Sequence, residues 1–224
     1  MNNLFYDGFN SKLVETASFD GFLEMPILNV PKEIILPTSA VPYSQRKKLK
    51  SDTEMLVFYE QDPEFRDFVS VPQSFMKELE NVKIFSTPDC SVYRDMPYVF
   101  QLANIAVSRS VGYYLQQQGK YVIPNARWGD KRTYTKSHFD CIPAFSGIPK
   151  NSIVSIGTYG CSKSKEDKYF LEAGFEAMLT ELTPQVVIVY GSYNPKIFGK
   201  YEHYTHFHHL PDWTTYVHNR KKVG

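Results

Sequence analysis

The chain of 224 residues is long enough for one large domain, and its 42% apolar content suffices for a packed core, which excludes wholesale disorder. It carries 25 Lys and Arg residues against 24 Asp and Glu residues, and this net charge of +1 excludes a strongly basic nucleic-acid coat but permits a local basic patch. No stretch approaches the ~20 uninterrupted apolar residues of a membrane-spanning helix, so we expect no membrane partner.

The N-terminal sequence and the cysteines indicate the cellular compartment. The N-terminal sequence MNNLFYDGFNSKL has no basic start followed by an apolar run, so it is not typical of a signal peptide. Cys90, Cys141 and Cys161 make an odd number with no close pair, which argues against a disulfide framework. We therefore expect a cytoplasmic protein whose cysteines are buried and inert.

The chain divides at about residue 50. Residues 1–50 are expected to form an N-terminal arm that packs on a single α/β domain of residues 51–224. Within the arm, residues 33–36 predict a short strand, and the basic run at 45–50 predicts a loop with a solvated surface. Residues 55–59 are a continuous apolar run followed by acidic residues and proline, which is typical of a buried strand.

From residue 55 onward, short apolar runs alternate with helical segments. We expect further strands at 82–86, 121–124, 153–156 and 186–190, and helices at 64–80 (interrupted near Pro72), 95–119 (with Asp95 as N-cap) and 165–182. Apolar runs separated by helices favour a mostly parallel sheet with crossover helices. Both an open three-layer sheet and a small or incomplete barrel fit this order.

Polar residues gather where the predicted strands end. In parallel α/β folds ligands bind at the carboxyl ends of strands, so these residues are expected to share one rim. The candidate ligand-binding residues are Ser91, Tyr93, Arg94, Asn125, Arg127, Trp128, Arg132, Thr158, Gly160 and Lys163.

The arginines of this rim indicate an anionic ligand. The guanidinium groups of Arg94, Arg127 and Arg132 match phosphate and carboxylate oxygens in pairs, and Trp128 offers a flat face to a base or sugar. This combination predicts a phosphorylated ligand, either a nucleotide or a nucleic-acid end. The alternative is that the arginines form structural ion pairs with neighbouring aspartates.

Three aspartates are the candidate catalytic residues. Asp89 together with Asp95 or Asp130 could serve general acid–base chemistry or metal-assisted phosphoryl chemistry, which makes a divalent metal a possible cofactor. No known metal-binding motif accompanies them. The same aspartates could instead neutralise the arginines of the rim.

Other patterns are weaker. The turn at 157–160 resembles a phosphate-binding loop in position but lacks the full motif, so a plain tight turn is the simpler interpretation. Gln101, Asn104, Ser108 and Gly112 form a polar stripe that either lines a cavity or faces solvent. His203, His206, His208 and His209 have metal-compatible spacing, but residues 204–210 also alternate like an edge strand.

Several of these segments together resemble a family of unknown function from phages, plasmids and integrated elements, mainly of Gram-positive bacteria. The matching segments are DCSVYRDMP (89–97), VIPNARWGD (122–130), GIPKNS (147–152), GTYGC (157–161), VYGS (189–192) and Asp212-Trp213. The resemblance spans roughly residues 55–215, so residues 1–50 and the extreme C-terminus lie outside it, and the histidine cluster is not part of the family pattern. It implies a mobile-element setting, with a role in replication, nucleotide handling or counter-defence in the cytoplasm of the host cell.

Three functions remain open from the sequence. The first, favoured because polar residues cluster at several strand ends, is a nucleotide- or nucleic-acid-processing enzyme. The second is a non-catalytic binder that sequesters a nucleotide signal or inhibits a host protein. The third is a DNA-binding accessory that uses the basic run at 45–50, and the near-neutral net charge counts against it.

Overall fold

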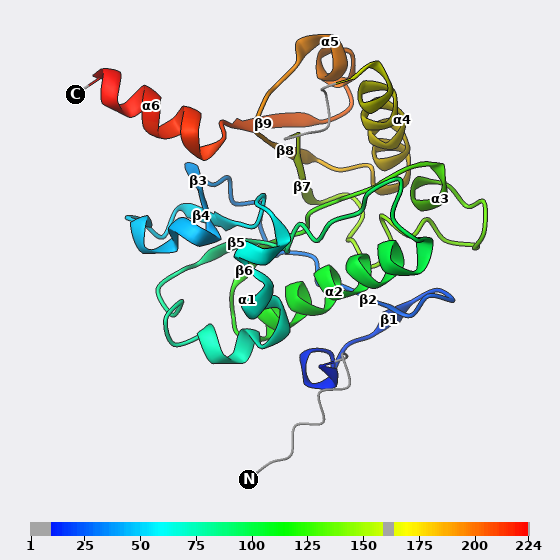
Figure 1. Ribbon diagram of the computed structural model, residues 1–224, viewed down its shortest axis with the longest axis horizontal. Coiled ribbons are helices and arrows are strands. Elements are labelled where there is room, and N and C mark those ends of the chain that lie inside the picture. Colours follow the sequence, from blue (N-terminus) through cyan, green and yellow to red (C-terminus); the bar gives the residue numbers. More distant parts are fainter. Residues whose placement is uncertain (1–9, 159–163, 224) are drawn as a thin grey trace.

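The computed structural model describes residues 10–158 and 164–223, and it contains two parallel sheets covered by helices (Figure 1). The first sheet has the order β3 (Ser39–Pro42), β4 (Glu54–Val57), β5 (Ile84–Ser86) and β6 (Tyr121–Ile123). The second has the order β7 (Ile153–Gly157), β8 (Val186–Tyr190) and β9 (His206–Leu210). A parallel bridge between Asn125 and Ser155 joins β6 to β7. A small antiparallel pair, β1 (Phe19–Asp20) and β2 (Met25–Pro26), lies apart.

Helices cover the outer face of each sheet. Helix α2 (Tyr98–Gln117) packs on β4, β5 and β6 with α1 (Arg66–Ser70), and α4 (Lys165–Leu182) packs on β7 and β8 with α5 (Pro195–Phe198). Short α3 (Lys131–Tyr134) follows the chain out of β6, and α6 (Trp213–Val223) follows β9 and extends to one side of the molecule (Figure 1).

The inner faces of the two sheets share one apolar core. Because side chains alternate along a strand, the residues that do not face the helices point to the opposite side. These residues come from all of β3 to β9 and form a single cluster that includes Ala40, Met55, Ile84, Ile123, Ile153, Ile188 and Leu210. The sheets therefore face each other, joined along one edge, as in an incomplete barrel.

The barrel is open between β9 and β3. Within the described residues no strand pairing joins these two strands, and the imidazole Nε2 of His208 in β9 donates instead to the carbonyl of Pro37, which precedes β3, at 2.8 Å. The prediction of a mostly parallel α/β fold with crossover helices is thus confirmed. In the described part of the chain no helix is both long and apolar enough to cross a membrane.

Most of the predicted elements are present, and two match to the residue. Helix α4 and strand β8 have the predicted bounds, since α4 begins at a capping box of Ser164 and Asp167 and β8 consists of four β-branched residues followed by Tyr190. The alternating segment at 204–210 contains β9, which is an edge strand as predicted. Helix α6 was not expected from the sequence.

Three predictions about elements are wrong. Residues 33–36 form no strand; the strand lies beyond Pro37, and the backbone N–H of Ile35 donates instead to the Tyr121 hydroxyl. The run at 45–50 is largely a 3₁₀-helix, η2 (Tyr43–Lys48), not a loop. Asp95 does not cap α2, because the helix begins after Pro97, and the Gln101 side chain holds the preceding carbonyl of Met96.

Candidate functional site

A cavity of about 1150 Å³ opens at the carboxyl ends of the parallel strands. Each of the strands β3 to β9 contributes to its wall, either with its last residue or with the loop that follows. Representative lining residues, in strand order, are Pro42, Tyr59, Asp89, Arg127, Gly157, Tyr190 and Asp212. The strand ends therefore converge on one cavity, at the place where parallel α/β folds bind ligands.

Asp89 is the buried carboxylate of this cavity. Its side chain is 10% exposed, and its Oδ1 accepts a hydrogen bond of 2.7 Å from the Asn125 side-chain amide. Nη1 of Arg127 lies 3.7 Å from its Oδ2. Burial raises the pKa of Asp89 above its ordinary value, and the nearby Asp62 carboxylate adds to the rise, while Arg127 and Asn125 oppose it. A buried carboxyl with a raised pKa at a cavity is suited to acid–base chemistry.

Asn125 is held rigidly beneath Asp89. It is 1% exposed, and the Tyr59 hydroxyl donates to its Oδ1 at 3.1 Å, which orients the amide N–H₂ towards Asp89. Its backbone N–H donates to the Thr87 hydroxyl at 2.9 Å. Burial raises the pKa of Tyr59 well above its usual value, so its hydroxyl stays protonated and remains a donor.

Arg109 of α2 fixes the backbone below Asn125. It is 1% exposed, and its guanidinium donates to the carbonyls of Asn125, Ala144 and Ser146 at 3.1, 2.8 and 3.1 Å. Burial lowers the pKa of Arg109 to about 10, so it is still charged at neutral pH. This buried cation ties the loop before α3 to the segment that leads into β7.

The polar stripe of α2 neither lines the cavity nor faces solvent. The Asn104 amide donates to the Ser91 carbonyl at 2.7 Å, and the Ser108 hydroxyl donates to the Pro88 carbonyl at 2.7 Å. Together with the contact of Gln101 to Met96, these bonds hold the loop that carries Asp89. Both interpretations of the stripe from sequence were therefore wrong, and its role is to anchor this loop.

Two aromatic rings form the inner wall of the cavity. The rings of Tyr59 and Tyr190 stack with centroids 4.8 Å apart. Gly157 lies against them, and a Cβ at this position would be 2.5 Å from a carbon of the Tyr59 ring. Glycine is therefore required at the end of β7 for steric reasons.

Arg94 and Arg127 line the cavity, and both have carboxylate neighbours. Arg94 pairs with Asp167 at 2.8 Å and Glu166 at 3.4 Å, and its guanidinium lies over the Phe170 ring. Asp95, the expected partner, is exposed at the cavity edge.

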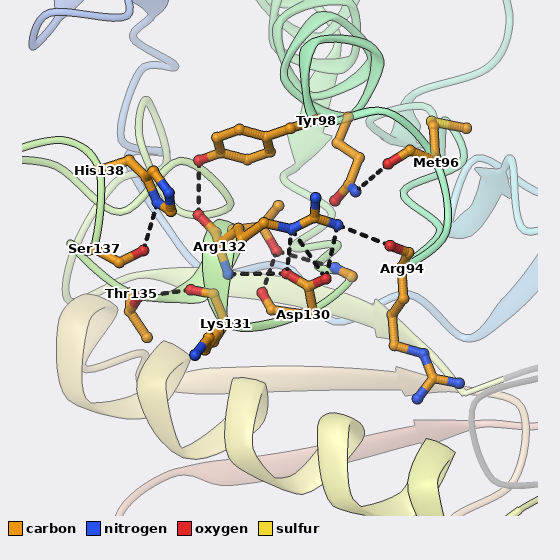
Figure 2. Close-up of polar contacts among 12 residues, drawn as sticks. Arg94, Met96, Tyr98, Asp130, Lys131, Arg132, Thr135, Ser137 and His138 are labelled. Atoms are coloured by element: carbon orange, nitrogen blue, oxygen red, sulfur yellow. Dashed lines mark hydrogen bonds and ion pairs between the residues drawn. The ribbon is translucent and has the colours of Figure 1, made fainter.

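Asp130 and Arg132 form a separate cluster that does not line the cavity (Figure 2). Asp130 caps α3 by accepting from the Arg132 backbone N–H, and its carboxylate also binds the Arg132 guanidinium at 2.8 Å. The same guanidinium donates to the Arg94 carbonyl at 2.8 Å. Figure 2 shows the Arg94 side chain pointing away from this cluster.

The remaining candidates have mixed positions. Trp128 lines the cavity, but its indole N–H donates to the Phe170 carbonyl at 2.9 Å and its ring packs on Gly174. Tyr93 is an exposed lining residue, and Ser91 donates to Asp62. Thr158 is buried and donates to the Ser192 carbonyl. Gly160 and Lys163 lie outside the described residues.

The charged residues of the cavity lining are mostly acidic. Among its described residues the two guanidinium groups of Arg94 and Arg127 face seven carboxylates, which belong to Glu60, Glu64, Asp89, Asp95, Glu166, Asp167 and Asp212. A ligand with negative charge would therefore meet repulsion everywhere except near the two arginines.

Comparison with known proteins decides the family. A family model described as "Domain of unknown function (DUF4417)" matches residues 17–208. The chain belongs to this family. The DUF4417 match begins well before residue 55, where we expected the resemblance to start, and it includes β3 within the segment that we interpreted as an arm.

The curated relatives of this DUF4417 protein come from phages. It is 34% identical over 136 residues to the Gene 1 protein of Mycobacterium phage D29 and, over the same length, to the Gene 1 protein of Mycobacterium phage L5. The match covers 61% of the chain but only 48% and 56% of the relatives, so it spans about half of their length. No solved structure matches. The chain is thus a phage-associated protein of unknown function.

The histidines and cysteines were considered as metal ligands or nucleophiles, and their contacts in the structure bear on both roles. In the described part of the chain, no group of three or more His, Cys, Asp or Glu side chains converges as metal ligands would. The imidazole of His209 interacts with the Gly191 carbonyl at 2.6 Å. Cys90 is buried, and burial raises the pKa of its thiol, so the thiol stays protonated. Cys161 lies outside the described residues.

Tyr59, Tyr190 and Asp212 are among the cavity residues that the sequence analysis did not name as candidates. Tyr59 ends the apolar run that begins in β4, and Tyr190 is the last residue of β8, so a polar aromatic residue at the end of a buried apolar run was the available signal. Asp212 was noted only through the family resemblance. It follows β9, in a tail that showed no periodicity beyond that strand.

Proposed function

We propose that the DUF4417 cavity binds a phosphorylated ligand, either a nucleotide or a nucleic-acid end, and that Asp89 acts on it as an acid–base group. The observation that supports this most strongly is the buried Asp89, oriented by Asn125 and flanked by Arg127, at a cavity of about 1150 Å³. Small-molecule sites have volumes of about 300–1,000 Å³ and use few, well-positioned polar groups, so this cavity is large enough for such a ligand.

The roles of Asp89 and Arg127 follow from their environment. The raised pKa of Asp89 makes its carboxylate a better base than an exposed one, suited to accepting a proton from an attacking water or hydroxyl. Arg127 supplies positive charge beside the same atoms, where negative charge would develop on phosphoryl oxygens. Nη1 of Arg127 lies 3.7 Å from Oδ2 of Asp89, so its positive charge stands beside the carboxylate that would act on the ligand.

The acidic lining implies that the ligand binds with a divalent cation. Carboxylate oxygens and phosphate oxygens are the ligands that Mg²⁺ takes, and a cation between them would remove the repulsion noted above. We therefore expect phosphorylated ligands to bind more tightly when Mg²⁺ is present.

A thermal-shift screen tests this proposal. Mononucleotides, cyclic dinucleotides and short oligonucleotides would be added with and without Mg²⁺ to the wild type, to Arg94→Ala/Arg127→Ala and to the control Arg132→Ala. A ligand that binds only the folded chain raises the Tm by mass action. A shift with one phosphorylated class, retained in Arg132→Ala and lost in the double variant, is expected. No shift with any class, or an equal shift in all three proteins, would sink the proposal.

A second candidate is a non-catalytic binder that captures a nucleotide signal or a host protein. The observation that favours it is the excess of carboxylates at the cavity, which suits a basic protein segment. It predicts stoichiometric binding without product formation, and Asp89→Asn would leave that binding intact. Turnover that is lost in Asp89→Asn would exclude this candidate.

A further inference from the structure

A second cavity, of about 620 Å³, lies between η2 and α6. Four cationic side chains line it: Lys47, Lys48 and Lys50 from the basic run, and Arg220 from α6. All four are exposed. Throughout the described residues, none of the four forms an ion pair with a carboxylate. We call this cavity the basic groove.

The single carboxylate of the basic groove does not cancel this charge. Glu54 is buried, and its carboxylate already accepts hydrogen bonds from the Ser39 hydroxyl and from the backbone N–H groups of Lys50 and Ser51, at 2.9, 2.6 and 3.2 Å. The basic groove therefore presents net positive charge to solvent, in a protein whose total charge is only +1. Such a local concentration attracts a polyanion.

Flat aromatic rings lie among these cations. Trp213 and Tyr216 are one helical turn apart on α6, and their ring centroids are 5.7 Å apart. Nζ of Lys48 lies 5.8 Å from the centre of the Trp213 ring, and the Arg220 guanidinium lies 5.6 Å from that of Tyr216. Cations interleaved with partly exposed rings are the surface that single-stranded nucleic acids prefer, because phosphates meet the charges and bases stack on the rings.

Trp213 also lines the large cavity, so the two cavities adjoin at this residue. Its position is fixed, because its backbone N–H donates to the Tyr190 hydroxyl at 3.1 Å and Asp212 caps the first turn of α6. A strand that follows the basic groove would reach the large cavity where Asp212 and Tyr190 lie.

We infer that the basic groove binds single-stranded nucleic acid and directs the end of the strand over Trp213 into the large cavity. The first part stands on the basic groove alone. The second part rests on the proposed function and narrows its ligand from a free nucleotide to a nucleic-acid end.

Fluorescence anisotropy with labelled single-stranded oligonucleotides of about 12 nucleotides tests the inference. The variants are Lys48→Ala/Lys50→Ala in the basic groove and, as the control with the same loss of charge, Lys131→Ala/Lys136→Ala on the α3 side of the molecule. For four phosphate contacts the slope of log K against log salt is roughly −3, and loss of two contacts should reduce it by about 1.4. The control should keep both the affinity and the slope. Equal affinities and slopes in the two variants would overturn the inference.

Stacking is tested separately from charge. Tyr216→Ala should weaken oligonucleotide binding by about tenfold, because base–aromatic stacking is lost, whereas Tyr216→Phe keeps the ring and should retain most of the affinity. Unchanged binding in Tyr216→Ala contradicts stacking on this ring. Stronger binding of a polyglutamate peptide or of anionic vesicles than of the oligonucleotide overturns the choice of ligand.

Arg127→Ala separates this inference from the proposed function. Oligonucleotide binding that survives in Arg127→Ala and fails in the Lys48/Lys50 variant supports the basic groove, whatever the mononucleotide screen gives. Binding that is lost only in Arg127→Ala refutes the basic groove and leaves the proposed function in place. If the basic groove binds the oligonucleotide but no nucleotide-induced Tm shift depends on Arg127, the proposed function is refuted and nucleic-acid binding by the basic groove is supported.

Discussion

Two aspartate–arginine pairs follow strands of the same sheet, and their surroundings differ. Asp89 lies at the large cavity, with Nη1 of Arg127 3.7 Å from its carboxylate and burial raising its pKa. Asp130 lies outside that cavity, bonded to Arg132 at 2.8 Å, and its hydrogen bonds to Arg132 lower its pKa despite partial burial. In two Asp–Arg pairs of the same composition, the pKa of the aspartate carboxyl is therefore raised in one pair and lowered in the other.

The difference lies in how the acceptor sites of each carboxylate are used. Asp130 accepts from the backbone N–H, Nε and Nη2 of Arg132, so its oxygens are engaged in holding α3. Asp89 accepts from Asn125 and borders the cavity. An Asp–Arg pair indicates a candidate site only when the carboxylate borders a cavity while remaining largely desolvated, and the four predictions below test this distinction.

The largest expected effect concerns the support beneath Asp89. Arg109→Ala would leave the buried carbonyls of Asn125, Ala144 and Ser146 without their donor, and we expect the free energy of unfolding to fall by roughly 3–5 kcal/mol. Arg132→Ala, which removes a partly exposed pair, should cost about 1 kcal/mol or less. Urea unfolding followed by circular dichroism measures both. Equal losses of unfolding free energy in Arg109→Ala and Arg132→Ala would show that the support beneath Asp89 is no more important for stability than the Asp130–Arg132 pair.

The second prediction concerns Asp89 itself. Asp89→Asn should reduce turnover of the ligand identified by thermal shift by roughly 10²–10⁴-fold, because the base is lost. Its stability should be equal or higher, since an uncharged amide replaces a carboxyl whose ionisation is disfavoured by burial.

Asp130→Ala provides the contrast to Asp89→Asn. We expect turnover within a few-fold of the wild type but a loss of about 1 kcal/mol in stability, because the cap of α3 is removed. Loss of turnover in Asp130→Ala without loss of stability would place the functional carboxylate at Asp130, outside the large cavity, and would contradict the role given to Asp89.

The third prediction concerns the loop that carries Asp89. Ser108→Ala leaves the Pro88 carbonyl without its donor, which should cost about 1 kcal/mol and reduce turnover by about tenfold as Asp89 shifts. Ser110→Ala is the matched control on the same helix, because its hydroxyl bonds only within α2, to the Ala106 carbonyl at 2.9 Å. Turnover equally affected in both variants would contradict a positioning role for Ser108.

The fold was predictable where local signals agree. The apolar face of α4 ends just before Pro184 and strand β8 is a continuous apolar run, and both were predicted with the correct bounds. Convergence of the strand ends followed from the parallel pairing. Strand β3, with the sequence SAVP, has no pattern of its own, because it is defined by its pairing with β4, and so the sequence placed it in an arm.

The partners of the charged residues were not predictable, because they come from distant segments. Arg94 pairs with Asp167, 73 positions away, rather than with the adjacent Asp95. The burial of Arg109 has no local signal in the sequence either, since it depends on carbonyls more than 30 positions away at Ala144 and Ser146. Local sequence therefore indicates which residue types reach the strand ends, and only the packed structure decides which of them remain available to a ligand.

The smallest expected effect is a difference in pH dependence between the two carboxyls. The pKa of Asp89 is raised in the folded chain, so its protonated form contributes stability that is present below the ordinary Asp pKa of about 4 and is lost as pH rises through the raised value. The pKa of Asp130 is lowered, so its contribution is present above about pH 4 and is lost as pH falls through the lowered value.

Urea unfolding between about pH 3 and pH 7 measures this difference. The stability of the wild type relative to Asp89→Asn should decrease with rising pH, whereas its stability relative to Asp130→Asn should increase. If both stability differences change with pH in the same direction, burial does not dominate the pKa of Asp89. Because Asn125 and Arg127 both favour the ionised form of Asp89, a curve of opposite sign to that of Asp130 would require desolvation to outweigh them, which is the physical basis for assigning Asp89 an acid–base role.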